Sequence, residues 1–287
     1  MNERKYPQLW QSYQWWRECS ELRKKHNLRI NAIERGVSSM DTQFEEDMME
    51  TMPWGERITT TKTRTVDVIL NLDQLVAATK QVMINFGSLV PVWDWVTSIR
   101  GLGQGGLAAQ VLAHIDDIEK FSNVSKLWRY SGYGLYDYFY DGNTCKGPKD
   151  GWKYSDTKKD ENGYPVREFV VNTPKEGWEL RHQIDRKVAG WVCPYNTPLK
   201  SALYLVGDQF IKQNTHPYRE IYDEEKERQA TLHPDMAKHV IDKRGRRKAV
   251  KIFAQHLWLK WRQAENLPIS EPYVQAIMGH SDIITPE

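Results

Sequence analysis

Apolar side chains recur at helical spacing in the first ninety residues of the chain. Between residues 6 and 31 they fall three or four positions apart, at Tyr6, Leu9, Trp10, Tyr13 and Trp16. A second set between residues 66 and 86 repeats in the same way, at Val66, Ile69, Leu72, Leu75, Val76 and Val82. Such spacing gathers each set on one side of a helix. We therefore predict a helical region over residues 1–90, whose apolar stripes suit a coiled coil or a dimerisation segment.

Glycines interrupt the helical pattern between residues 92 and 115. A short apolar segment ends at Ile99, and an Ala- and Leu-rich segment begins near Gln104 or Gly105. The turn between them reads Gly101-Leu102-Gly103. We predict a helix-hairpin-helix within residues 91–135, with Leu102 pointing inward to fix the turn.

A turn of this kind suits a phosphate group. Glycines adopt backbone conformations that other residues avoid, and they let the chain approach an anion closely. The free amides at the start of the second helix, with the helix dipole behind them, then face the phosphate. The candidate DNA-binding residues of this turn are Gly101, Leu102, Gly103, Gln104, Gly105 and Gly106. The alternative is a tight turn between helices whose glycines serve packing only.

Residues 136–190 differ from the rest of the chain, because Gly, Asp, Lys, Tyr and Pro dominate there. A β-prone run at residues 167–171 follows the turn-forming pair Asn162-Gly163. We predict a turn-rich insertion that contains a small β-hairpin. Helical spacing returns in the C-terminal region, residues 191–287. The predicted fold class is therefore mainly α, a helical bundle that contains a helix-hairpin-helix and carries this insertion.

The composition is that of a globular protein, with 40% hydrophobic and 27% charged residues among 287. The longest apolar runs are well short of the ~20 residues that a membrane span needs. We expect a cytoplasmic protein without membrane association. The three cysteines, Cys19, Cys145 and Cys193, are scattered, unlike a disulfide framework or a zinc site. We expect no cofactor and no metal site, and we interpret most of the 12 tryptophans as core residues.

The formal net charge of +2 conceals a strongly basic segment. Residues 236–262 carry nine basic side chains and one acidic side chain, Asp242, which gives +8 for the segment and leaves −6 for the remainder. The nine are Lys238, Lys243, Arg244, Arg246, Arg247, Lys248, Lys251, Lys260 and Arg262. Segregated charge creates a local field even when the total is near zero.

The basic segment also has helical spacing. One predicted face carries Arg244, Lys248, Lys251, Gln255, Trp258 and Arg262, and the other carries Ala249, Ile252, Phe253, His256 and Leu257. We predict that the basic side contacts DNA phosphates, with Arg244, Arg246, Arg247, Lys248 and Lys251 as candidate DNA-binding residues. The alternative is a solvated surface helix. We interpret His256 as a hydrogen-bonded core residue and not as a metal ligand.

Two stretches resemble a known family. Residues 99–121 and 126–133 are similar to the C-terminal domain of the insertion-sequence transposases related to the Piv DNA invertase. The shared pattern is a Gly-hydrophobic-Gly hairpin, an Ala/Leu helix, an acidic-Ile-x-x-Phe turn and a Leu-x-x-Tyr/Trp-x-Gly helix. Weaker similarity extends the match to about residues 90–265 and includes residues 194–200. The resemblance implies DNA as a partner, and it adds Lys200 to the candidate DNA contacts.

The chain departs from that family in its catalytic parts. The transposases carry an N-terminal RuvC-like domain whose four acidic residues hold divalent metal ions, whereas residues 1–90 are predicted to be helical. They also carry a nucleophilic serine in a Gly-rich stretch. In this chain the corresponding region is residues 136–190, where Ser155 is the only serine and hence the one weak catalytic candidate.

Three hypotheses follow from these observations. The first is a DNA-binding protein that holds duplex or branched DNA by its backbone phosphates without catalysis of its own. The second is an active transposase or recombinase of the same family, which would need a divalent metal. The third is a helical protein-interaction module, with a possible homodimer through the N-terminal helices.

Overall fold

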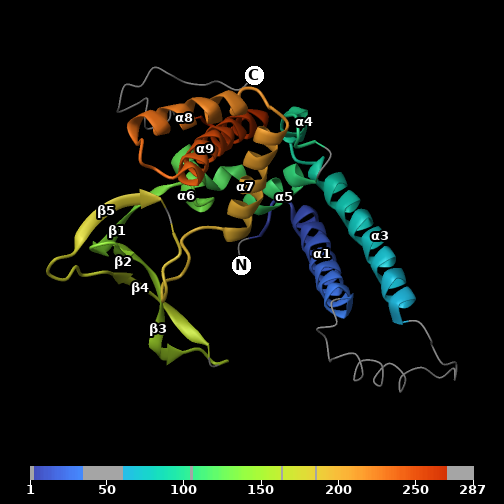
Figure 1. The fold of residues 1–287 in the computed structure, drawn as a ribbon, viewed down its shortest axis with the longest axis horizontal. Coiled ribbons are helices and arrows are strands. Elements are labelled where there is room, and N and C mark those ends of the chain that lie inside the picture. Colours follow the sequence, from blue (N-terminus) through green and yellow to red (C-terminus); the bar gives the residue numbers. More distant parts are fainter. Residues whose placement is uncertain (1–2, 35–60, 104–105, 163, 185, 270–287) are drawn as a thin grey trace. The chain divides into compact units, whose positions relative to one another are not determined.

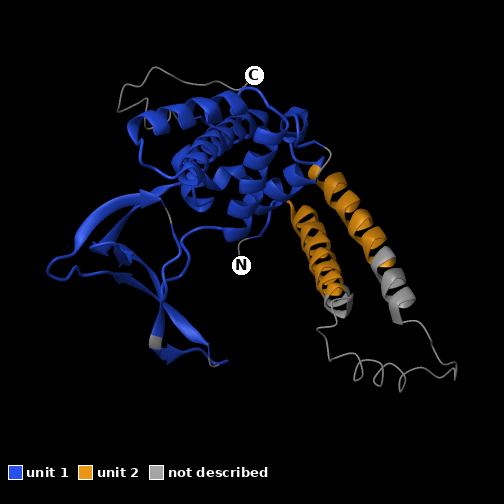
Figure 2. Cartoon of the chain, viewed as in Figure 1, with its two compact units in different colours: residues 1–5, 88–287 blue, residues 6–87 orange. Residues whose placement is uncertain are grey.

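The computed structural model describes residues 3–34, 61–103, 106–162, 164–184 and 186–269. The chain divides into two compact units, which are coloured separately in Figure 2. One unit is Tyr6–Gly87, and the other joins Met1–Lys5 to Ser88–Glu287. No helix of the described ranges is both long and apolar enough to cross a membrane.

The unit Tyr6–Gly87 contains two long helices that pack against each other, α1 (Pro7–Glu34) and α3 (Thr61–Gly87). An ion pair between Arg23 and Asp73 links them. These helices confirm the helical spacing predicted at residues 6–31 and 66–86. Several apolar side chains remain exposed on them, namely Trp15, Leu22, Leu28, Leu75 and Val82. Their role in a dimer stays a prediction.

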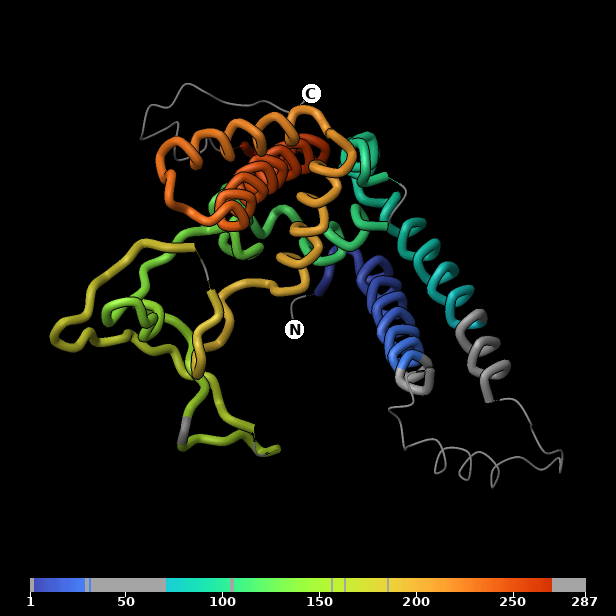
Figure 3. Tube along the Cα trace, in the orientation of Figure 1, coloured from blue at the N-terminus to red at the C-terminus, as the bar shows by residue number. Residues whose placement is uncertain are grey.

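The second unit is built on a set of helices (Figures 1 and 3). They are α4 (Trp93–Ser98), α5 (Leu107–Ile115), a 3-10 turn (Ile118–Lys120), α6 (Val124–Tyr130), α7 (Thr197–Lys212), α8 (Tyr218–Leu232) and α9 (Lys238–Ala264). The longest of these, α9, contacts α6, α7, α8 and the 3-10 turn. The mainly α class is therefore confirmed.

The core of this unit consists of rings and aliphatic side chains around α9. Phe253 of α9 packs edge-on against Phe210 and Tyr218, whose rings stack with centroids 4.3 Å apart. His256 is buried beside them, and its Nδ1 lies 3.0 Å from the Tyr218 hydroxyl. The prediction that His256 is a hydrogen-bonded core residue is confirmed. Burial raises the pKa of the Tyr218 hydroxyl, so this hydroxyl keeps its proton.

Asparagine caps set where two of these helices begin. The Asn123 side chain accepts a hydrogen bond from the Lys126 amide at 3.0 Å, and α6 starts at the next residue. The Asn196 side chain accepts from the Leu199 amide at 3.0 Å and begins α7, where Pro198 lies in the first turn. Each cap satisfies an amide that has no partner within its own helix. The starts of α6 and α7 are thereby fixed close to the site described below.

The strands lie in the segment between α6 and α7. They are β1 (Leu135–Asp141), β2 (Thr144–Pro148), β3 (Asp150–Lys159), β4 (Pro165–Val171) and β5 (Glu179–Ile184). The first sheet has the antiparallel order β2-β1-β5, and β3 pairs with β4 in a second, two-stranded sheet. The β3–β4 hairpin confirms the predicted hairpin at Asn162-Gly163. The other three strands were not predicted.

The predicted helix-hairpin-helix falls on α4, α5 and the turn between them, and the described residues do not show that motif there. The two helices are short and pack against different partners. Trp95 of α4 stacks on Phe253 of α9 with ring centroids 6.3 Å apart, whereas α5 packs chiefly on α7. The structure therefore shows two short helices around a glycine-containing turn, each supported by a separate long helix.

A buried carboxylate joins α8 to α9. Glu225 is 4% exposed, and its oxygens accept hydrogen bonds from Arg228 at 2.6 Å, Gln229 at 2.6 Å and Lys248 at 3.1 Å. Burial alone would raise the pKa of Glu225, but these donors outweigh it and lower the pKa to about 2. Glu225 therefore remains ionised down to about pH 2.

Replacing this carboxylate by an amide tests its contribution to stability. We expect Glu225→Gln to lower the free energy of unfolding at neutral pH by about 1.5–3 kcal/mol, the contribution of a hydrogen bond to a charged group. Because the folded-state pKa is depressed, the stabilisation is complete above pH 4.5 and is lost as the pH falls towards 2. Urea denaturation over this pH range should show the two proteins converging. The exposed neighbour Glu224→Gln is the control, and a difference that persists unchanged to pH 2 would contradict the assignment.

Candidate nucleic-acid interface

The basic side chains at the start of α9 face two different neighbours. Two of them turn towards α8: the Arg244 guanidinium donates to the Gln229 side chain at 2.6 Å, and the Lys248 ammonium pairs with Glu225 at 3.1 Å. These two interactions connect α9 to α8. Both remain exposed in part, but Lys248 already has an ionised carboxylate as its partner.

The far end of the predicted basic face is buried, which corrects the prediction that Arg262 lies on an exposed basic face and agrees with the interpretation of most tryptophans as core residues. Trp258 is 2% exposed, and its indole N–H donates to the Phe121 carbonyl at 2.7 Å. The Arg262 guanidinium donates to main-chain carbonyls of Ile118, Phe121 and Pro268. The Trp258 indole and the Arg262 guanidinium thus provide hydrogen bonds to carbonyls around the 3-10 turn. These hydrogen bonds offset the cost of burying the polar atoms on both sides.

Four other basic residues surround the turn that ends α6. Arg246, Arg247 and Lys251 come from α9 and Lys200 from α7, and we call them the basic cluster. The Arg247 guanidinium donates to the Tyr133 carbonyl at 3.4 Å, and the Lys200 side chain packs against Gly132. Gly132 has a φ of 76°, and an added Cβ would lie 2.8 Å from Lys200. The glycine therefore makes room for the lysine as well as for the turn.

Aromatic rings support the side chains of the basic cluster. The Lys251 ammonium lies 4.0 Å from the centre of the Trp128 ring, and the Lys200 ammonium lies 4.1 Å from that of Tyr195. The Arg246 guanidinium lies 4.6 Å from the Tyr204 ring. Such cation–π contacts orient each charge over its ring. Arg246 differs from the others, because Asp208 at 2.6 Å and Asp242 at 3.2 Å offset its charge.

Lys251 experiences a positive local field. Burial and the charge of Arg247 together lower the pKa of Lys251 to about 8. An adjacent carboxylate would raise this pKa, so the direction shows that repulsion and desolvation dominate at this position. The charged form of Lys251 is therefore less favourable here than in water.

The glycine turn at 99–106 has packing reasons for its sequence. Leu102 is fully buried, which confirms its predicted inward position. Gly101 has a φ of 91° and packs against Gln209 and Gln213 of α7. A Cβ on Gly103 would lie 2.7 Å from the Thr97 carbonyl oxygen. Gly106, with a φ of 70°, precedes α5 as its N-cap; Gln104 and Gly105 lie outside the described residues.

The structure separates this turn from the basic cluster. Gly101 contacts α7 at positions 209 and 213, nine and thirteen residues beyond Lys200. Gln213 lies just beyond the end of α7. At about 1.5 Å and 100° per residue, Gln209 lies roughly 13 Å from Lys200 along the helix and on its opposite side. Lys200 and the glycine turn therefore lie on different sides of α7.

Ser155, the weak catalytic candidate, lies in β3. Its hydroxyl oxygen accepts hydrogen bonds from the amides of Lys158 at 3.1 Å and Thr157 at 3.4 Å. These bonds support an irregular part of the hairpin, where the β3–β4 register shifts. Within the described ranges, no three His, Cys, Asp or Glu side chains come together as a possible metal site.

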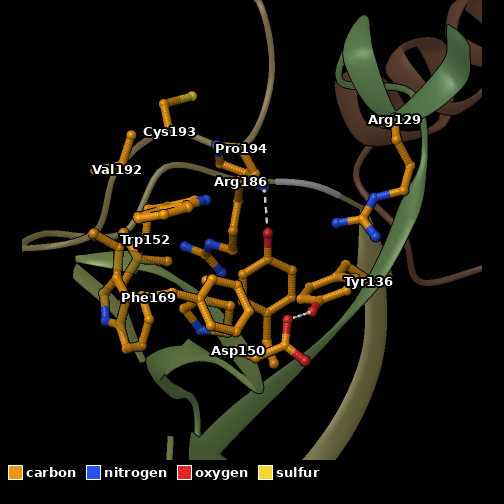
Figure 4. A pocket seen from close by; sticks show the side chains of 14 residues that line it. Arg129, Tyr136, Asp150, Trp152, Phe169, Arg186, Val192, Cys193 and Pro194 are labelled. Atoms are coloured by element: carbon orange, nitrogen blue, oxygen red, sulfur yellow. Dashed lines mark hydrogen bonds between the residues drawn. The ribbon is translucent and has the colours of Figure 1, made fainter. Parts of the chain in front are cut away.

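Sequence reasoning missed a cavity of about 340 Å³ among the strands. Its lining includes Tyr136, Asp150, Trp152 and Phe169, together with Arg129 and Arg186 (Figure 4). The Tyr136 hydroxyl donates to the Asp150 carboxylate, and burial together with this bond raises the pKa of Tyr136 to about 12. The abundance of Trp and Tyr between residues 136 and 191 was the available signal, but the pairing of distant strands that assembles them is not visible in sequence.

The close approach at Gly103 generates a stability prediction. We expect Gly103→Ala to lower the free energy of unfolding by about 1–3 kcal/mol, because its methyl group would overlap the Thr97 carbonyl oxygen. Gly151→Ala is the matched control, since its Cβ would meet only ordinary contacts at 3.5 Å or more. Chemical denaturation measures both variants. An unchanged midpoint together with weaker DNA binding would show that Gly103 serves phosphate approach and not packing.

The chain was compared with protein-family models, curated proteins and solved structures, and no match was found. The similarity to transposases therefore depends on the residues quoted from the sequence, and the assignment of a function depends on the geometry of the basic cluster.

Proposed function

We propose that this protein binds DNA through its backbone phosphates and that the basic cluster is the main contact. The observation that carries the proposal is the pairing of Arg247 with Lys251, whose pKa is lowered to about 8. Desolvating one cation beside another costs free energy in the unbound protein. A phosphate placed between them would remove the repulsion and restore the charged form of Lys251.

The chemistry of the basic cluster favours phosphates over bases. Its ammonium and guanidinium groups donate hydrogen bonds and accept none, and aromatic rings fix their directions. Contacts of this kind position DNA without reading its sequence. The proposal includes no catalytic step, and Ser155 has no part in it.

The glycine turn supplies a second contact in this proposal, in the manner of a helix-hairpin-helix. Gly106 and the first residues of α5 are buried, so a phosphate would approach this turn at the exposed Gly101. Because this turn and the basic cluster lie on opposite sides of α7, a single straight duplex does not reach both. The arrangement supports branched DNA, or two DNA segments held by one molecule.

Salt dependence provides the direct test of the phosphate contacts. We expect Arg247→Gln combined with Lys251→Gln to reduce the slope of log affinity against log salt by about 1.8, since each phosphate contact contributes about 0.9. Fluorescence anisotropy with a duplex of random sequence measures this slope. Lys24→Gln combined with Lys25→Gln removes the same charge from exposed positions of α1 as a control. Equal slopes for both double variants would refute the proposed interface.

The pKa of Lys251 predicts a pH dependence of binding. As the pH rises from 7 to 9, Lys251 loses its proton in the free protein, and DNA affinity should fall by about tenfold through proton linkage. Lys251→Arg should abolish most of this fall, because arginine stays charged throughout the range. Affinities at constant ionic strength would show the difference. A parallel fall in the two proteins would mean that another group titrates.

A further inference from the structure

The cavity among the strands suggests a second site with a different ligand chemistry. We propose that it takes one unpaired base of a DNA strand. This inference goes beyond phosphate binding by the basic cluster, and it depends on different residues.

Aromatic side chains gather on one face of the β3–β4 hairpin. Trp152 pairs across the strands with Phe169, and their rings meet edge-on with centroids 5.6 Å apart. Tyr154 pairs with Arg167, whose guanidinium lies 5.8 Å from the tyrosine ring. Trp152 and Phe169 are 53% and 56% exposed, although they are among the most hydrophobic side chains in the chain. Exposed rings grouped on one face mark a binding surface.

The spacing of these rings suits separated bases. Trp152 and Tyr154 point to the same face of β3, two residues apart, which places them about 6.6 Å apart along the strand. This distance is about twice the 3.4 Å rise of stacked bases in a duplex. A single strand with its bases drawn apart therefore matches this face better than a duplex does. Stacking on protein rings is the usual way of holding such bases.

Charged groups at the cavity complement the parts of a nucleotide. Arg129 lies over the Tyr136 ring at 4.1 Å, and Arg186 donates to the Tyr140 hydroxyl at 2.7 Å, so both guanidinium groups are held by neutral partners. They are available to a phosphate at the cavity mouth. Inside, the Asp150 carboxylate can accept a hydrogen bond from a base N–H group. Figure 4 shows Asp150 beside Tyr136, with the Arg129 guanidinium close to the same ring.

The position of Arg129 connects the two sites along the chain. It belongs to α6, next to Trp128, the ring under Lys251 of the basic cluster. The turn after α6 leads directly into β1, which supplies Tyr136 to the cavity. A strand whose phosphates lie on the basic cluster would therefore pass Arg129 before a base enters the cavity. The volume of about 340 Å³ lies within the range of roughly 300–1,000 Å³ that is typical of small-ligand sites.

Abasic DNA separates base binding from phosphate binding. The probe is a single-stranded 15-mer of thymidines, compared with a 15-mer of abasic residues that has the same phosphates. We expect the thymidine strand to bind about five- to hundredfold more tightly, the range of one stacked base. Trp152→Ala should bring this ratio close to one without changing the affinity for the abasic strand. Because Trp152 is half exposed, its loss should leave the fold intact, which circular dichroism would verify.

Control variants distinguish this proposal from the proposed function. Tyr164→Ala removes a ring that is 69% exposed on the same hairpin but does not line the cavity, and it should leave the ratio unchanged. The double variant at Arg247 and Lys251 should weaken both strands by the same factor. If the basic cluster does not bind phosphates, the double variant will bind both strands as tightly as the wild-type protein does. The ratio of the two affinities in the wild-type protein would not be affected by that result.

Three results would overturn the inference. The first is equal affinity of the wild-type protein for the two strands. The second is an equal loss for both strands in Trp152→Ala, which would indicate a structural role or an interface between copies. The third is displacement of the thymidine strand by free thymidine monophosphate at concentrations near the strand's own Kd, which would reassign the cavity to a free nucleotide.

Discussion

Burial of the C-terminal half of α9 is the constraint on which the rest of the larger unit depends. Trp258 and Arg262 donate hydrogen bonds to the carbonyls of the 3-10 turn, and Trp261 is fully buried beside them. Because α9 is one continuous helix, fixing this half also fixes the rotation of the other half at about 100° per residue. Arg247 and Lys251 are thereby directed at the turn that follows α6.

One helix therefore serves as core and as surface. Its hydrophobic side chains and two of its polar ones hold the 3-10 turn and α7, while its first half presents charge. A change of register that suited DNA better would move Phe253 out of its contacts with Phe210 and Tyr218. Packing therefore sets the positions of the cations. The aromatic rings and carboxylates around them determine how strongly each cation attracts an anion.

The sequence predicted the elements that depend on local periodicity. The helices at 6–31 and 66–86, the inward Leu102 and the hydrogen-bonded His256 follow from spacing along one segment. The predicted basic face was wrong at Arg262 because periodicity does not show how much of a helix is covered. Long side chains with polar ends can be buried wherever main-chain carbonyls accept their hydrogen bonds.

The strands β1, β2 and β5 and the cavity could not be predicted from local sequence patterns, because they depend on contacts between distant residues. β1 pairs with β5 across about forty residues, so its stability comes from contacts that no short window contains. Tyr136 and Trp152 are brought to one cavity by that pairing and by the β3–β4 hairpin. The glycine turn was located correctly, but its separation from the basic cluster follows from the way each contacts α7.

The ionised Glu225 gives the interface an internal counterion. It is anchored to Lys248 and stays charged down to about pH 2, so this lysine has an anion before any DNA arrives. A cation already neutralised by its own protein releases no salt ion on meeting a phosphate, and it gains little entropy from the encounter. Of the row of positive charges on α9, only a part can therefore drive association. If the protein binds DNA as we propose, the same acidic helix that stabilises the fold would keep that complex readily reversible.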